Sequence, residues 1–249
     1  MAATPSWPPR SAPRLFVGHT LAEGASVSIN GQQAHYLAKV MRVREGDVVI
    51  LCDDQTGEWT STVENVGKRS VELHVASNLR PREDVPDLWL CAALLKKDRF
   101  DLVMEKATEL GVARIMPIVT RRCVADKLNL ERAQNIVTEA AEQCARTALP
   151  LIEAPIKLQA LLHDWPQDRA LYFADEMGGD PALDAFSSDQ RASALLVGPE
   201  GGFDEAERAM IRAHPSARPI SLGPRILRGE TAAIVALAVW MAAKGDWSN

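Results

Sequence analysis

The sequence predicts a two-domain protein, with a small β module followed by a larger α/β domain built on a parallel sheet. From Arg14 to Val75, short apolar stretches rich in β-branched residues alternate with glycine-containing turns, which is typical of antiparallel β structure. Beyond residue 88, wholly apolar strands alternate with helical patterns, and this favours a parallel sheet with helices on both faces. The polar, proline-containing stretch 77–87 separates these two sequence patterns and predicts a linker.

The first domain, residues 14–76, is expected to be a small β-barrel or sandwich interrupted by one helix. The predicted strands are RLFV, SVSI, GDVVILCD, EWTSTVENV and SVELHV. In the helix, Ala34, Leu37, Val40 and Met41 share one face, which leaves basic side chains on the other.

The second domain, residues 88–246, is expected to contain strands at 88–95, 112–119, 170–175, 194–198 and 219–223. Helices are expected up to Leu110, from about Leu130 to Ala148, from Asp204 and from Glu230. Asp204 and Glu207 form an aspartate variant of the capping box. The last helix is apolar on nearly every side, which predicts that it is buried all round.

Composition excludes several classes of protein. Of 249 residues, 47% are hydrophobic and 24% charged, as in a globular domain rather than a disordered chain. The net charge of −5 argues against binding nucleic acid by bulk charge and leaves a local basic face open. The four cysteines have no CxxC pair, so reduced thiols in apolar positions are expected, with no metal site.

The sequence also bears on localisation. No apolar stretch reaches the roughly 18 residues that a membrane span requires. The first residues lack the apolar core of a signal peptide. A cytoplasmic protein without membrane contact is therefore expected.

Two glycine-containing turns indicate a ligand site. LLVGPEGGF (195–203) and ISLGPRILRGETAA (220–233) each place an apolar strand before a Gly-Pro corner that leads toward a helix. GPEGGF lacks the Lys-Ser/Thr that ends a P-loop and does not have GxGxxG spacing, so a nucleoside triphosphate is disfavoured. Each motif alone is compatible with an ordinary turn, but ligands of parallel sheets bind at the carboxyl ends of strands, where both turns lie.

The two loops, together with KKDRFDLVMEKATELGV and AAEQCAR, strongly resemble the RsmE family of 16S ribosomal RNA uridine N3-methyltransferases, within the SPOUT superfamily. The resemblance covers nearly the whole chain, with the motifs in family order. It implies a PUA-like RNA-binding β-barrel at the N-terminus and a SPOUT α/β domain containing a trefoil knot. It also implies a homodimer that methylates 16S rRNA, in the assembled 30S subunit.

The resemblance further implies S-adenosyl-L-methionine as cofactor, held by backbone groups of the knot loops. The positions that correspond are Leu196, Val197, Gly198, Pro199, Glu200, Gly201, Ser221, Leu222, Gly223, Ile226, Leu227 and Arg228. A side chain at Gly198 or Gly223 is expected to weaken binding, because glycine lets the main chain approach the ligand.

Uridine N3 becomes nucleophilic only after losing its proton, so the site needs a proton acceptor and cationic groups near the developing anion. Arg228 and Arg146 are the candidates for charge stabilisation. Glu142, with Gln143, Glu200 and Glu230, is a candidate to orient them or to accept the proton. Glu142 and Arg146 are also spaced as a simple surface ion pair on a helix.

Basic residues in both domains are candidates for contact with RNA phosphates. In the first domain they are His35, Lys39 and Arg42, with Arg44 beside them. In the second they follow the first two strands and are Lys96, Lys97, Arg99, Arg121 and Arg122. For the first group, a solvated helix face is the alternative interpretation.

Three other functions remain open from the sequence. A different SPOUT activity, ribose 2′-O-methylation, would use the same loops with another pocket shape. A non-catalytic RNA-binding ribosome assembly factor would bind no cofactor. A nucleotide-binding metabolic enzyme would fit the α/β pattern but leaves the β module without a role.

Overall fold

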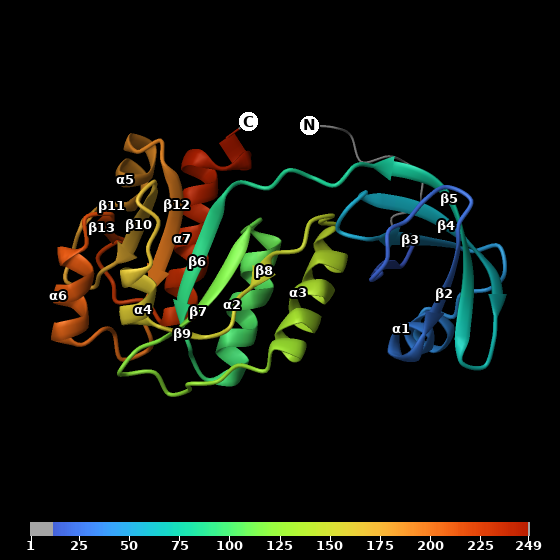
Figure 1. The fold of residues 1–249 in the computed structure, drawn as a ribbon, viewed down its shortest axis with the longest axis horizontal. Helices are drawn as coiled ribbons and strands as arrows, with labels where there is room; N and C mark the ends of the chain where they lie inside the picture. Colours follow the sequence, from blue (N-terminus) through green and yellow to red (C-terminus); the bar gives the residue numbers. More distant parts are fainter. Residues whose placement is uncertain (1–11, 249) are drawn as a thin grey trace. The chain divides into compact units, whose positions relative to one another are not determined.

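The computed structural model describes residues 12–248, which divide into two compact units (Figure 1). One unit contains the chain up to Asp84 together with residues Ala141–Ala148. The other contains Val85–Ala140 and Leu149 onward. The helix α3 (Leu130–Cys144) therefore begins in the second unit and ends in the first.

The N-terminal unit is built on a curled five-stranded sheet of order β1-β3-β4-β5-β2. β1 pairs with β3 in parallel and the other neighbours are antiparallel. The strands are β1 (Arg14–Phe16), β2 (Ser26–Asn30), β3 (Val48–Cys52), β4 (Glu58–Val66) and β5 (Ser70–Arg80). Irregularities in the β4–β5 register bend the sheet into a half-barrel around Leu37, Leu51 and Leu73.

The predicted helix of this unit consists of two short pieces, α1 (Gly31–His35) and the π-helix η1 (Tyr36–Val40). Ala34 and Leu37 are buried as predicted, but Val40 and Met41 are exposed. The widened turn explains the difference, because the Met41 N–H bonds to the Tyr36 carbonyl five residues back and shifts the helical period.

The predicted linker is shorter than expected, because β5 continues to Arg80. Arg80 pairs with Glu58 across the sheet, and its side chain forms an ion pair with the same glutamate, which also binds Arg14. Gly57, at φ 104°, permits the close crossing, since a Cβ there would lie 2.3 Å from the Arg80 carbonyl oxygen.

The second unit contains an eight-stranded sheet in which every pairing is parallel, as predicted. Its order is β11-β13-β10-β12-β6-β7-β8, with β9 also paired to β7. The strands are β6 (Leu88–Ala93), β7 (Arg114–Val119), β8 (Leu151–Ile152), β9 (Ile156–Lys157), β10 (Arg169–Ala174), β11 (Asp180–Pro181), β12 (Ala192–Val197) and β13 (Ala217–Ser221). β8, β9 and β11 were not expected from the sequence.

Helices cover both faces of this sheet, which confirms the predicted α/β class. One core cluster joins α2 (Lys97–Glu109), α3, α5 (Ala182–Ser188) and α7 (Gly229–Lys244). The opposite cluster joins α4 (Leu158–His163) and α6 (Glu205–Ala213). A short 3₁₀ helix, η2 (Asp246–Ser248), follows α7.

Two helices differ from expectation in detail. α3 ends at Cys144 rather than near Ala148, because Ala145 adopts a positive φ of 61°. Cys144 is consequently exposed at the helix end, whereas Cys52 and Cys91 are buried as expected. α7 is not buried all round, since Ile234 and Val235 are partly exposed.

The capping box before α6 is present as predicted. The Asp204 side chain accepts from the Glu207 N–H, and Glu207 accepts from the Asp204 N–H. The hydrogen bond from the Glu207 N–H, together with one from the Arg121 side chain, holds the pKa of Asp204 below its ordinary value. Within residues 12–248, no helix has the length and apolarity of a bilayer span.

Candidate active site

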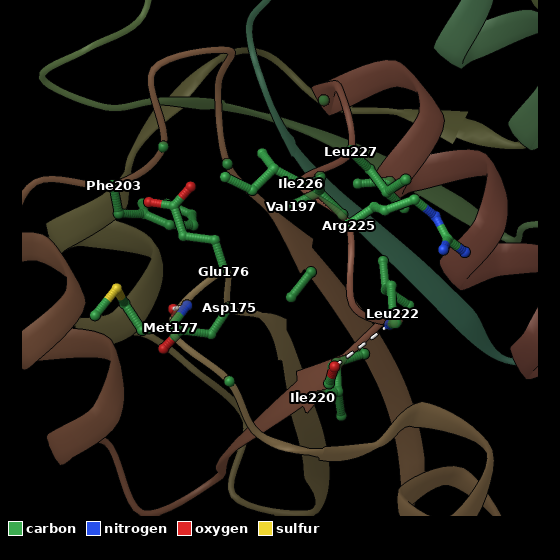
Figure 2. A pocket seen from close by; sticks show the side chains of 18 of the residues that line it. Asp175, Glu176, Met177, Val197, Phe203, Ile220, Leu222, Arg225, Ile226 and Leu227 are labelled. Atoms are coloured by element: carbon green, nitrogen blue, oxygen red, sulfur yellow. Dashed lines mark hydrogen bonds between the residues drawn. The ribbon is translucent and has the colours of Figure 1, made fainter.

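The two glycine-containing loops lie at the same edge of the parallel sheet, but their strands are not neighbours. β10 separates β12 from β13, so a third loop, Asp175–Gly178, lies between them. The three loops surround a cavity of about 320 Å³, within the size range of small-molecule sites. Figure 2 shows Glu176 and Met177 on one side of this cavity and Ile226 and Leu227 on the other.

The cavity combines an apolar lining with exposed backbone and a few carboxylates. Apolar contacts come from Val197, Phe203, Ile220, Leu222 and Leu227. Glu176 and Glu200 supply acceptors that suit hydroxyl or ammonium groups. Such a lining can take a ligand that has both an apolar part and polar or charged groups.

Glycine is required at this site for steric and conformational reasons. A Cβ on Gly198 would lie 2.9 Å from the Phe203 ring. Gly223 adopts φ 110°, a conformation that other residues rarely take, and its N–H bonds to the Ser221 hydroxyl. Gly198 is therefore needed for the packing of its loop against Phe203, and Gly223 for the backbone conformation of the second loop.

Most of the predicted cofactor contacts line the cavity. They are Val197, Gly198, Pro199, Glu200, Ser221, Leu222, Gly223, Ile226 and Leu227. Leu196, Gly201 and Arg228 are not among the lining residues; Leu196 is fully buried in β12, and Arg228 is the exposed N-cap of α7. Their cofactor contacts stay a prediction.

Sequence reasoning missed the loop after β10. It identified the strand that ends at Asp175 but assigned no site residue to the segment that follows this strand. The available signal was a buried strand followed by Glu-Met-Gly-Gly, the same strand-to-glycine pattern as in the other two loops.

Two arginines from α6 fix this third loop. The Asp175 carboxylate is fully buried and pairs with Arg212 at 2.6 Å and with Arg208 at 3.2 Å. Arg208 also reaches Glu176 at 2.8 Å. Glu176 is thus held at the cavity wall by a residue that itself lines the cavity.

The first glycine loop is held from the other side by residues that follow β6 and β7. Arg99 Nη1 lies 2.7 Å from Glu200 Oε1 and 3.6 Å from Glu230 Oε1, at the start of α7. Arg122 donates to the Gly201 and Phe203 carbonyls, and Arg121 pairs with Asp204. These three arginines, predicted to contact RNA, are engaged with the loop in this structure.

Lys96 and Lys97 are exposed at the start of α2, next to Arg99. His35, Lys39 and Arg42 are exposed in the N-terminal unit. The structure is compatible with their predicted RNA contacts, which stay predictions.

Glu142 and Arg146, the other catalytic candidates, belong to the N-terminal unit and do not line the cavity. Glu142 accepts a hydrogen bond from the Phe16 N–H at 2.8 Å. Arg146 is buried, and desolvation lowers the pKa of its guanidinium. Their catalytic roles stay a prediction, and within this unit the bond from Phe16 to Glu142 ties residues 141–148 to β1.

Replacing Arg99 with alanine is expected to weaken binding of the predicted cofactor about tenfold. A hydrogen bond to a charged group is worth about 1.5–3 kcal/mol, and solvent screening of this partly exposed pair places the effect at the low end. Glu200 would lose its 2.7 Å partner, and Glu230, whose Oε2 is buried without a hydrogen bond, would lose its nearest cation. Calorimetric titration measures the change. Lys106→Ala, which removes a partly exposed charge from the same helix, serves as control. Equal affinities in the two variants would contradict this positioning role.

Comparisons with known proteins agree with this site. A family model described as an RNA methyltransferase domain matches residues 82–241, and one described as an RNA methyltransferase PUA domain matches residues 29–76. The chain is 32% identical, over 228 residues, to ribosomal RNA small subunit methyltransferase E of Rickettsia conorii, covering 90% of this chain and 93% of that protein.

Solved structures give the same result. A methyltransferase from Legionella pneumophila, in complex with the cofactor SAM, superposes with a TM-score of 0.85 at 31% identity, covering 94% of this chain and 99% of that chain. The ribosomal RNA small subunit methyltransferase E of Neisseria gonorrhoeae, bound to S-adenosyl methionine, gives 0.86 at 27% identity, covering 95% and 99%.

Proposed function

Because the chain belongs to the ribosomal RNA small subunit methyltransferase E family, it is an S-adenosylmethionine-dependent methyltransferase of 16S ribosomal RNA, and we propose that it methylates uridine at N3. The observation that carries the assignment is the cavity formed by the three loops at the carboxyl edge of β10, β12 and β13. Its glycines and its apolar lining are those that the family motifs place around the cofactor.

The residues present fit an adenosyl cofactor. Val197, Ile220 and Leu227 offer apolar contact for the base, and the carboxylates Glu176 and Glu200 offer acceptors for hydroxyl or ammonium groups. At Gly223 the space where a side chain would lie is open, so a ligand can approach the backbone there. When bound, S-adenosylmethionine supplies a methyl group on a positively charged sulfur.

The chain's own task is to prepare the uracil. Loss of the N3 proton places negative charge on the ring carbonyl oxygens, which cationic groups stabilise. Arg228 lies between two cavity-lining residues, Leu227 and Gly229, and its side chain is exposed. Of the two arginine candidates, Arg228 is the one flanked by cavity-lining residues, and we assign it the stabilisation of the uracil anion.

The proposal extends to the assembly. Ile234 and Val235 leave an apolar strip on α7 partly exposed, which a second copy of the chain would cover in a homodimer. After β12 the chain passes β10 to form β13, and α7 then returns to pack against β12 and β6. This path supports the trefoil knot that the resemblance implies.

We place the enzyme in the cytoplasm, acting on the assembled 30S subunit.

Ribose 2′-O-methylation is the alternative that keeps the same cofactor. The experiment is incubation with labelled S-adenosylmethionine and either 30S subunits or naked 16S rRNA, followed by nucleoside mapping. We expect 3-methyluridine, formed faster on 30S subunits. Label on a ribose hydroxyl would refute the N3 assignment, and calorimetry without any cofactor binding would favour a non-catalytic assembly factor.

A further inference from the structure

The N-terminal unit contains a second hollow, of about 310 Å³, beside α1 and η1. Its cationic or titratable lining residues are His35, Lys39, Lys68 and Arg69. The remaining lining residues are Gly31, Ala34, Ala38, Gly67 and Ser70, all small. Among the residues that the structure describes, no carboxylate lines this hollow, which we call the basic groove.

The fold brings the two basic pairs together from separate parts of the sequence. Asn30, the last residue of β2, pairs with Ser70, the first residue of β5. α1 begins directly after Asn30, and the turn between β4 and β5 ends at Ser70. Because Asn30 and Ser70 pair, the helix and the turn meet the sheet at the same place. The bond from the Gly67 N–H to the Ser70 carbonyl at 2.9 Å closes this turn and presents Lys68 and Arg69 at its tip.

The charges of the basic groove are not neutralised by the protein. All four side chains belong to exposed residues, and in the described part of the chain none of them forms an ion pair. The nearby acids of β4 and β5 are engaged elsewhere: Glu72 accepts from Ser28, and Glu64 lies beside His74. In a chain with a net charge of −5, three unpaired cations in one hollow, Lys39, Lys68 and Arg69, favour an anionic ligand.

We propose that the basic groove binds phosphate groups of the RNA backbone, an inference that rests on the proposed RNA substrate. The small residues leave room for a phosphate, while Lys39 on one side and Lys68 and Arg69 on the other supply donors. Lys and Arg contacts to phosphate carry little sequence information, so the groove contributes affinity and orientation rather than choice of nucleotide. Lys68 and Arg69 thereby join His35 and Lys39 in one site.

The test compares the double variant Lys68→Ala/Arg69→Ala with wild type, using transcribed full-length 16S rRNA as the probe over a series of KCl concentrations. Each phosphate contact contributes about 0.7–0.9 to the slope of log K against log[salt], so the slope is expected to fall by about 1.4–1.8. Affinity at roughly 50 mM salt is expected to fall about tenfold. The control is Lys106→Ala/Arg218→Ala, which removes the same charge from surface positions outside the basic groove.

Both variants are expected to keep the wild-type thermal midpoint and cofactor affinity, since the turn residues are exposed and lie outside the cavity. An unchanged salt slope, or a change equal to that of the control, would overturn the inference. The inference would also be overturned if polyglutamate, but not RNA, bound to the basic groove, because the groove would then be a site for an acidic peptide. Failure of the wild-type enzyme to methylate rRNA at all would instead count against the proposed function.

Discussion

Replacing Gly198 with valine is expected to weaken S-adenosylmethionine binding about a hundredfold, the upper end of the roughly 1–3 kcal/mol that overpacking costs. The first atom of the new side chain would lie 2.9 Å from Phe203, which is buried and packs edge-on against Phe173 at 5.3 Å. Phe203 therefore has little freedom to retreat, and the loop itself must shift. Calorimetric titration with the cofactor measures the loss.

The same substitution is expected to lower stability, because overpacking costs about 1–3 kcal/mol. The matched control is Gly18→Val, since Gly18 is exposed and lies in the other unit, and a Cβ added there would meet no atom within 4 Å. This control is expected to retain cofactor affinity. If Gly198→Val bound the cofactor with normal affinity, the cavity would not be its site.

The strands that carry the first two loops could be predicted because each contains a short apolar stretch directly before a Gly-Pro corner. β4 was predicted at its observed bounds, and β12 and β13 within a few residues, since their patterns differ sharply from the flanking turns. The capping box at Asp204 could also be predicted, because its hydrogen bonds join residues only three positions apart in the sequence. Local signals of this kind do not depend on the rest of the fold.

Strand order could not be predicted by the same means. Whether β13 pairs with β12 or passes to the far side of β10 is decided by long-range packing, and the loop at Asp175 enters the site only in the second case. The ion pairs of Arg99 with Glu200 and Glu230 depend on the same topology. Arg99 was therefore predicted as an RNA contact from its charge and position, while its pairing with the cofactor loop went unseen.

The boundary between the two units within α3 also could not be predicted from the sequence. The pattern of α3 is continuous, so Glu142 and Arg146 were assigned to the methyltransferase domain. In the structure Ala145 turns the chain, and the Glu83 side chain accepts from the Thr147 and Ala148 N–H groups, all within the N-terminal unit. A positive φ at alanine carries no sequence signal, because its occurrence reflects tertiary contacts rather than residue preference.

Replacing Arg228 with alanine is expected to lower kcat about 10²–10³-fold while leaving cofactor affinity unchanged, which is the magnitude of losing one preorganised donor to an oxyanion. Rate and cofactor affinity are expected to respond differently because the backbone and the side chain of Arg228 have different surroundings. The backbone carbonyl accepts from the Ala232 N–H at the start of α7, while the side chain is exposed. Backbone contacts to the cofactor survive the substitution, and the charge facing the uracil does not.

Single-turnover methylation of 30S subunits measures the rate, and calorimetry measures the cofactor. Arg228→Lys is expected to recover part of the rate, since it keeps the charge but loses the planar pair of donors. Arg218→Ala, an exposed arginine at the opposite end of β13, controls for the change in net charge and is expected to turn over normally. A normal kcat for Arg228→Ala would remove it from the mechanism and shift the search for the stabilising cation to Lys96 and Lys97, which are exposed at the start of α2.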